Sequence, residues 1–198
     1  MGKRIGILGG SFNPPHKGHI EIAQAVYDKG LVDEVWIVPC YDTRHDKELV
    51  AFADRLKMCQ LVVDTLDFPC YVDGSAPALD PKGEAITLID GFNKRYPDNT
   101  FHYIIGMDNA IFIDLWFDYE RLIKEVPFII FDRKNKAPIG NYAWTKNQRH
   151  TIVDDVTIMD VSSTEIREAI GQKNLTDGIF NVIDTKVFMF VFNNELYE

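Results

Sequence analysis

The sequence predicts an α/β fold in which helices cover both faces of a parallel sheet. Short apolar runs typical of buried strands, such as residues 5–8 and 34–39, alternate with segments whose apolar residues recur at helical spacing. One such segment, residues 18–29, lies between the first two strands, and a strand–helix–strand unit of this kind joins parallel strands. The alternation continues along the chain, so we expect a doubly wound sheet followed by a helical C-terminal part.

Local signals justify the individual elements. Gly30 is expected to end the first helical segment, since glycine is common at the position directly after a helix. Residues 74–83 are rich in proline, glycine and aspartate and predict a loop, and polar residues 134–149 predict a surface insertion. Strands are expected over residues 5–8, 34–39, 70–72, 101–105, 127–131 and 151–159. Helices are expected over residues 18–29, 52–63, 85–94, 119–124 and 162–170, with a terminal helix over 187–192.

The composition narrows the class of protein. A chain of 198 residues can bury one sizeable core, so we expect a single domain over residues 1–198. The formal net charge of −9 disfavours a nucleic-acid partner, which needs lysine and arginine gathered on one face. The first residues lack the apolar core of a signal peptide, and no apolar run has the length of a membrane span. We expect a cytoplasmic protein with small-molecule partners and no membrane partner. The sequence leaves the oligomeric state open, and a homo-oligomer is one of the alternatives.

The first candidate site, residues 9–19, directly follows the first predicted strand. Gly9 and Gly10 allow a tight turn and a close approach of the backbone to a ligand. His16 and His19 lie where the first helix begins, and the N–H groups of a helix N-terminus bind phosphate. The alternatives are two histidines at the surface or in a helix cap, or a zinc site, which two histidines without a thiolate support poorly. The position after a glycine turn favours a phosphate site.

The second candidate site opens the helix expected near residue 162. Ser162 and Glu165 have the spacing of a capping box. Ser163 and Thr164 then place hydroxyl and N–H groups at the helix end, and Arg167 lies one turn later, within reach of the same anion. A plain capping box with a surface arginine is the alternative if this segment is considered alone.

Both segments carry a resemblance to a known superfamily. Residues 10–19, GSFNPPHKGH, resemble the first signature of the HxGH nucleotidyltransferases, and residues 161–167, VSSTEIR, resemble their second. The resemblance implies a Rossmann-like fold and an enzyme that joins a nucleotide to a phosphate-bearing acceptor and releases pyrophosphate. It implies ATP as co-substrate, with Mg²⁺ bridging the phosphates. The nucleotide-binding residues it implies are Gly9, Gly10, Ser11, Phe12, Gly18, Gly106, Asp108, Ser162, Ser163 and Thr164.

The middle of the chain resembles the nicotinate mononucleotide adenylyltransferases. Pro39, the dipeptide Asp46-Lys47 after His45, and the spacing of Arg55 and Met58 match that family's pattern in order. The resemblance places Lys47 near the phosphates, whereas the alternative is a solvated lysine in a charged loop. We hypothesise direct attack of the acceptor phosphate on the α-phosphorus, without a protein nucleophile. The residues expected to supply donors are His16, His19, Lys47 and Arg167.

Four further residues are expected to bind the acceptor. Trp116 lies in a segment that resembles the family's W-x-x-[WY] pattern and would stack on the pyridine ring, with a core tryptophan as the alternative. The other expected acceptor residues are Asn13, Thr87 and Arg133. The family's S-Y-T-x-D-T-L segment, which contacts the nicotinate carboxylate, is reduced here to Thr87 and the leucine after it. Nicotinate and nicotinamide mononucleotide therefore both stay open as acceptors.

Three rival functions stay open at this level. One is another member of the same superfamily, such as a pantetheine-phosphate adenylyltransferase or a cytidylyltransferase. The second is a non-catalytic nucleotide sensor, although the retained His16, His19 and Arg167 favour catalysis. The third is a dehydrogenase, which the absence of a G-x-G-x-x-G turn after the first strand disfavours.

Overall fold

A computed structural model describes residues 2–42, 49–132 and 143–197 of the chain. Its described residues form a parallel sheet of six strands with the order β3-β2-β1-β4-β5-β6. The strands are β1 (Arg4–Gly10), β2 (Glu34–Pro39), β3 (Cys70–Val72), β4 (Thr100–Gly106), β5 (Phe128–Phe131) and β6 (Thr151–Val153). This is the strand order of Rossmann-like folds, and its direction reverses between β1 and β4. Ligands of such sheets bind at the carboxyl ends of the strands beside that reversal.

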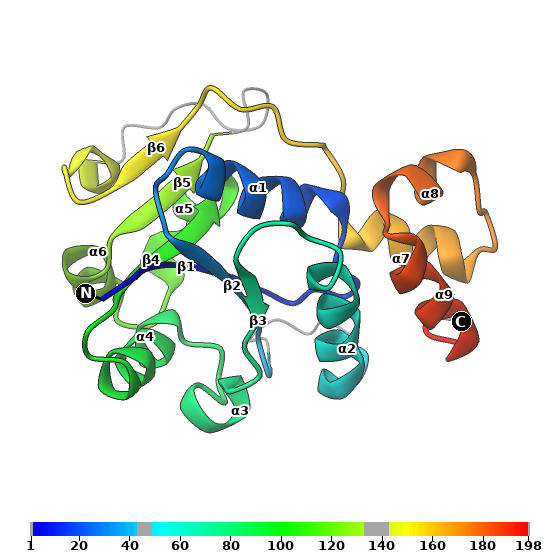
Figure 1. The fold of residues 1–198 in the computed structure, drawn as a ribbon, viewed down its shortest axis with the longest axis horizontal. Coiled ribbons are helices and arrows are strands. Elements are labelled where there is room, and N and C mark those ends of the chain that lie inside the picture. The colour runs from blue at the N-terminus through cyan, green and yellow to red at the C-terminus, as the bar shows by residue number, and fades with distance from the viewer. Residues whose placement is uncertain (1, 43–48, 133–142, 198) are drawn as a thin grey trace.

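Helices cover both faces of the sheet and extend beyond one side of it (Figure 1). The helices within the sheet region are α1 (Lys17–Asp28), α2 (Phe52–Val63), α3 (Ala76–Leu79), α4 (Ala85–Arg95), α5 (Met107–Ala110) and α6 (Tyr119–Glu125). The C-terminal helices are α7 (Ser163–Gly171), α8 (Asp177–Val182) and α9 (Thr185–Asn193). Two short 3₁₀ turns are η1 (Ile113–Leu115) and η2 (Ala143–Lys146).

The alternation of side chains along the strands separates two cores. Ile5 and Ile7 of β1 and Tyr103 of β4 face the layer formed by α4 and α6. Leu8 and Ile104 point to the opposite face, where they pack with α1 and α2. Successive side chains of a strand point to opposite faces, so strands buried on both sides are apolar throughout, which is why short continuous apolar runs predicted them.

The C-terminal helices form a third core against the outer side of α2, away from the sheet (Figure 1). Met58 and Val62 of α2 pack there with Ile166 of α7 and with Val187 and Val191 of α9. All five side chains are at most 4% exposed. The predicted α/β sheet and the helical C-terminal part, including the terminal helix, are therefore confirmed.

Two predicted elements were wrong. The strand expected over residues 151–159 ends at Val153, and Val156 and Ile158 pack against the second core without extending a strand. Apolar alternation reports burial on one side, and burial on one side does not require a ladder of hydrogen bonds. The loop expected over residues 74–83 contains α3, because Pro77 suits the first turn of a helix. The short elements α5, η1 and α8 were not expected.

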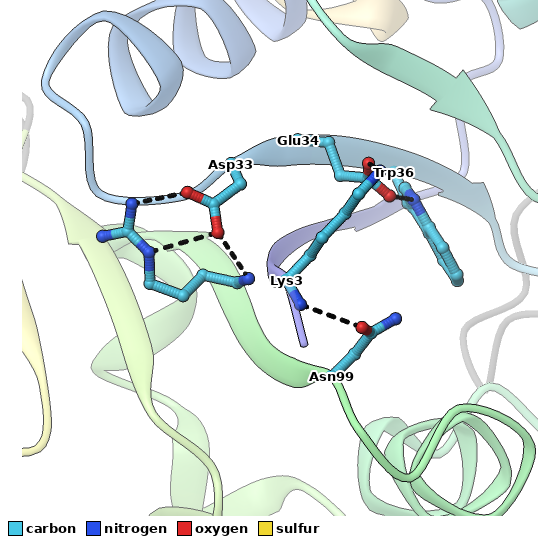
Figure 2. Close-up of polar contacts among 6 residues, drawn as sticks. Lys3, Asp33, Glu34, Trp36 and Asn99 are labelled. Carbon is cyan, nitrogen blue, oxygen red and sulfur yellow. Dashed lines mark hydrogen bonds and ion pairs between the residues drawn. The ribbon is translucent and has the colours of Figure 1, made fainter. Parts of the chain in front are cut away.

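Charged side chains tie the strands together at the amino-terminal edge of the sheet, opposite the candidate site. Glu34 at the start of β2 lies between Lys3 and Trp36 (Figure 2). Lys3 Nζ lies 2.5 Å from Glu34 Oε2, and Trp36 Nε1 donates to Glu34 Oε1 at 2.9 Å. Arg4 and Asp33 form an exposed ion pair beside them, with 2.7 Å between nitrogen and oxygen.

Replacing Glu34 with alanine is expected to lower the free energy of unfolding by about 1–3 kcal/mol, because the half-buried Trp36 N–H loses its acceptor. Urea unfolding measures the change. Asp33→Ala is the matched control, and its effect should be smaller because the Arg4–Asp33 pair is exposed to solvent. The turnover of folded Glu34→Ala should equal that of the wild type. If Glu34→Ala and the wild type had the same free energy of unfolding, the prediction would be contradicted.

Candidate active site

The loop between β1 and α1 brings the first candidate segment to the carboxyl end of the central strand. β1 ends at Gly10, and His16 is the N-cap residue of α1. Phe12 has a φ of 46° and is 1% exposed, so its ring fills the space beneath a sharp turn. A Cβ at Gly9 would come within 2.4 Å of the Tyr103 hydroxyl, so only glycine fits there without movement of Tyr103. The rings of Phe12 and Tyr103 therefore pack tightly against this loop.

The two histidines lie against each other at the start of α1. Their rings stack with centroids 3.6 Å apart and an angle of 27° between the planes. His19 Nδ1 accepts a hydrogen bond from the backbone N–H of His16 at 3.2 Å. With Nδ1 as acceptor, the proton of a neutral His19 ring resides on Nε2. The His19 ring thus presents an N–H donor beside the N–H groups of the helix N-terminus, where an anion is favoured.

Helix α7 docks on the same loop from the far end of the chain. Ser163 Oγ donates to the backbone oxygen of Pro14 at 2.8 Å, and Arg167 Nη1 donates to that of Asn13 at 2.9 Å. Arg167 Nη2 also donates to Thr164 Oγ1 at 3.2 Å. The structure therefore brings the two candidate segments together, with two helix N-termini beside one loop.

The capping box expected at the start of α7 is confirmed. Glu165 N donates to Ser162 Oγ at 3.2 Å, and Ser162 N donates to Glu165 Oε2 at 3.0 Å. The box fixes where the helix begins, and it thereby fixes the direction in which Ser163 and Arg167 project. A local sequence signal thus positions a contact that reaches across the whole chain.

Arg55 of α2 is a loop-holding residue whose role the sequence analysis did not assign. It is 1% exposed, although it carries a full charge. Its guanidinium donates to four main-chain oxygens, those of Ser11 at 3.0 Å, Cys40 at 2.7 Å, Tyr41 at 3.1 Å and Val50 at 3.2 Å. These carbonyls belong to the glycine-turn loop and to both ends of the segment between β2 and α2. A planar fork of five N–H donors suits this task, which no lysine could perform.

The C-terminal tail also reaches this loop. Tyr197 donates its hydroxyl proton to Asn13 Oδ1 at 2.9 Å, and Val50 N donates to the same oxygen at 3.3 Å. Burial raises the pKa of Tyr197, so its hydroxyl is protonated and remains a donor at neutral pH. Asn13 itself is 1% exposed. Its side chain therefore holds the loop in place, and its expected contact with the acceptor stays a prediction.

Two of the residues expected on the adenosine side lie at the carboxyl end of β4 and just beyond it. Gly106 ends β4, and Asp108 is exposed in the first turn of α5. A Cβ at Gly106 would lie 2.2 Å from Asp108 Oδ1, so glycine is what allows this carboxylate to fold back over the strand end. In the first turn of α1, a Cβ at Gly18 would lie 3.1 Å from the Met159 backbone oxygen, so a larger residue would crowd α1 against residue 159.

Thr87 and Trp116, both expected to bind the acceptor, each lie next to a residue that lines a small cavity, Thr87 beside Leu88 in the chain and Trp116 against the ring of Tyr103. The half-buried Trp116 ring packs edge-on against Tyr103, with ring centroids 5.9 Å apart. Tyr103 lines the cavity together with Gly9 and Gly10. Thr87 lies in the first turn of α4 and donates its hydroxyl proton to Glu84 Oε2 at 3.1 Å. Trp116 therefore contributes to packing and also borders the region beside the glycine turn.

Two expected site residues, Lys47 and Arg133, lie outside the described residues. Over residues 2–42, 49–132 and 143–197, no three histidine, cysteine, aspartate or glutamate side chains gather where they could hold a metal ion. Among the helices that the structure describes, none is both long enough and apolar enough to cross a membrane.

Residues 7–169 match the model of a family described as cytidylyltransferase-like. A protein of Lactiplantibacillus plantarum named "Probable nicotinate-nucleotide adenylyltransferase" is 30% identical over 99% of this chain and 89% of its own. A protein of Exiguobacterium sibiricum with the same name is 32% identical over 85% of this chain and 87% of its own.

Solved structures agree in fold. The nicotinic acid mononucleotide adenylyltransferase of Plasmodium falciparum complexed with NaAD superimposes with a TM-score of 0.85. It is 23% identical, and the match covers 98% of this chain and 97% of that one. The same Plasmodium falciparum protein complexed with APC gives a TM-score of 0.83 at 22% identity. At these identities the structural likeness supports only the fold, and the family assignment rests on the family model and the sequence relatives.

Proposed function

The chain belongs to the cytidylyltransferase-like family and, within it, to the nicotinate-nucleotide adenylyltransferases, and we propose that it transfers the adenylyl group of ATP to a pyridine mononucleotide. The products are the corresponding dinucleotide and pyrophosphate. The observation that carries the proposal is the docking of α7 on the loop before α1, through Ser163 and Arg167. Two helix N-termini and an arginine then surround one place for a polyphosphate.

In the proposed reaction, a phosphate oxygen of the acceptor attacks the α-phosphorus of ATP in line with the leaving group. The new bond joins the two phosphates, and the bond from the α-phosphorus to the oxygen bridging to the β-phosphate breaks. The acceptor oxygen is already anionic, so no protein nucleophile or base is needed. Catalysis is then positioning and stabilisation of the charge that builds on the phosphates.

The proposed roles follow from the placement of the donors. His19 offers its Nε2–H to a phosphate oxygen, and His16 supports it by stacking. Arg167 holds the loop through Asn13 O, and a guanidinium with five N–H groups can also donate to an anion. Lys47 remains a proposed donor. On this view Gly106 and Asp108 serve the adenosine, and the remaining phosphate contacts come from the residues around the two helix starts, Gly9, Gly10, Ser11, Phe12, Gly18, Ser162, Ser163 and Thr164.

Mg²⁺ fits this site as a companion of the nucleotide. No three acidic, histidine or cysteine side chains gather among the described residues, and Mg²⁺ usually keeps several waters and binds through substrate phosphates. When bound to the triphosphate, it would offset part of the negative charge there. The protein's own contribution is the set of N–H donors around the loop.

Purified protein incubated with ATP and nicotinate or nicotinamide mononucleotide tests the proposal. We expect pyrophosphate release that requires both substrates, and a dinucleotide product on chromatography. CTP in place of ATP, and phosphopantetheine in place of the pyridine nucleotide, serve as matched controls and should give little product. Binding of ATP without pyrophosphate release from any pair would contradict the proposal and favour a nucleotide sensor.

A further inference from the structure

An extended segment connects β6 to α7 and brings the second candidate segment to the first. This β6–α7 linker, residues 154–162, lies within the described part of the chain, forms neither helix nor strand, and runs beside α1 (Figure 1). A segment outside a sheet lacks the ladder of hydrogen bonds that fixes the register of a strand. Other contacts must therefore set where the linker lies along α1, and with it where α7 begins.

Two side chains of the α1 region contact the linker. Lys29, the C-cap residue of α1, places its Nζ 2.6 Å from Asp155 Oδ2. Nearer the start of the helix, Glu21 Oε2 accepts from the backbone N–H of Met159 at 2.6 Å. At about 1.5 Å per helical residue and about 3.3 Å per extended residue, the stretches of helix and of linker between these contacts are each about 12–13 Å long. The linker thus runs extended and antiparallel to α1, and the two contacts fix its register.

The two contacts differ in strength. The Asp155 side chain is 65% exposed and that of Lys29 is 30% exposed, and ion pairs in solvent stabilise a fold little. Glu21 is half-buried, and a hydrogen bond to a carboxylate is about twice as strong as one between neutral groups. We therefore expect the Glu21 contact to hold the linker more firmly than the Lys29 contact does.

Met159 contacts α1 through both of its backbone polar groups. Gly18 lies one turn before Glu21 on the same face of the helix. A Cβ at Gly18 would lie 3.1 Å from the Met159 oxygen, so the carbonyl of Met159 rests against the helix backbone while its N–H bonds to Glu21. The linker is therefore fixed to α1 at this residue in both position and orientation.

The placement of Met159 determines the placement of α7. Ser163, the first residue of α7, follows soon after Met159, and Ser163 and Arg167 donate to main-chain oxygens of the loop before α1. Helix α1 carries His19 in its first turn and Glu21 directly after it. Because one helix holds both residues, Glu21 fixes the linker, and through it the donors of α7, relative to His19.

We propose that Glu21 is a positioning residue for adenylyl transfer, which sets the register of the β6–α7 linker and thereby holds Ser163 and Arg167 at the loop that carries His19. The proposal rests on the proposed function and deepens it, since it adds a residue that acts through Met159 and needs no contact with either substrate.

Amide hydrogen exchange of the protein without substrates tests the contact itself. The Met159 N–H should exchange about tenfold faster or more in Glu21→Ala than in the wild type, because it loses its acceptor. Glu21→Gln keeps an oxygen that can accept, so the rate should stay within about threefold of the wild type. Asp28→Ala is the matched control, since it removes an exposed carboxylate from the same helix, and it should leave this rate unchanged.

Steady-state kinetics with ATP and nicotinate mononucleotide test the positioning role. Glu21→Ala should lower kcat about tenfold and change the KM for ATP by less than about threefold, because displaced donors stabilise the transition state less. Glu21→Gln should recover most of the lost kcat, and Asp28→Ala should have the wild-type kcat. A residue that only stabilised the fold would leave the kcat of the folded variant unchanged.

A double-mutant cycle tests whether Glu21 acts through α7. In an Arg167→Ala background, Glu21→Ala should lower the rate by less than about threefold, whereas the effects of independent residues would multiply. Single-turnover measurements with enzyme in excess give the rates of these slow variants.

The possible outcomes distinguish the contact, the positioning role and the reaction. An unchanged Met159 exchange rate in Glu21→Ala overturns the proposal at its first step. Faster exchange with the wild-type kcat, or a tenfold loss that persists in the Arg167→Ala background, overturns the positioning role and leaves adenylyl transfer standing. A wild type without adenylyl transfer overturns the proposed function and the positioning role with it, while the exchange rates still show whether Glu21 holds the linker. Faster exchange, a lower kcat and recovery in Glu21→Gln together support the proposal.

Discussion

Replacing His19 with alanine is expected to lower kcat by about 10³-fold, because removal of one donor aimed at a developing charge costs about 10²–10³-fold and loss of a protonatable ring adds to this. The ring lies at the third position of α1, at the helix start where the phosphates are proposed to bind, and its Nδ1 already accepts from His16 N, which leaves Nε2–H as the donor of the neutral ring. Steady-state turnover of ATP with a pyridine mononucleotide measures the effect.

The same substitution has a smaller structural consequence, which can be measured separately. Alanine also removes the acceptor of the His16 N–H, and loss of a cap of this kind costs about 1 kcal/mol. His19→Asn keeps a side-chain oxygen near that N–H, so it should recover stability in urea unfolding but not the turnover. Full turnover in folded His19→Ala would contradict the role proposed for the histidine.

Replacing Arg55 with methionine is expected to lower the free energy of unfolding by about 3–5 kcal/mol. The methionine fills much of the volume, but four main-chain oxygens lose a charged donor whose own side chain is 1% exposed. Buried acceptors left without their donor cost about 1–3 kcal/mol each, and partial relaxation reduces the sum. Urea unfolding followed by circular dichroism measures the loss.

The effect of Arg55 should extend to catalysis, because its carbonyl partners include Ser11 of the glycine-turn loop. We expect kcat/KM of folded Arg55→Met to fall along with its stability. Arg55→Lys keeps the charge but lacks the planar fork, so it should be intermediate in both measurements. Lys57→Met is the matched control on the exposed face of the same helix, and its stability should change by less than about 0.5 kcal/mol. Equal urea midpoints for Arg55→Met and the wild type would contradict the role assigned to Arg55.

These contacts hold the loop of the candidate site in a fixed conformation. A loop of this kind needs stiffness to hold a phosphate without reorganisation during the reaction. Arg55 fixes the loop through Ser11, and further contacts come from the C-terminal part, where Arg167 and Tyr197 both reach Asn13. The helical C-terminal part therefore helps to hold the loop that forms the proposed phosphate site.

Periodicity determined most of the fold from the sequence alone. The strand over residues 34–39 and the helix over residues 52–63 have the predicted bounds in the structure, because buried parallel strands and amphipathic helices leave patterns within a single segment. The strand expected over residues 151–159 was wrong beyond Val153, since pairing at the sheet edge depends on a neighbouring strand and not on the segment's own pattern.

The candidate site divides along the same line. The glycine turn with His16 and His19, and the capping box of Ser162, were legible in the sequence because their chemistry lies within a few consecutive residues. The contacts of the buried Arg55 guanidinium depend on where separate segments meet. Only the tertiary structure decided these contacts, because the partners of a buried charge are brought together through folding and are not adjacent in the chain.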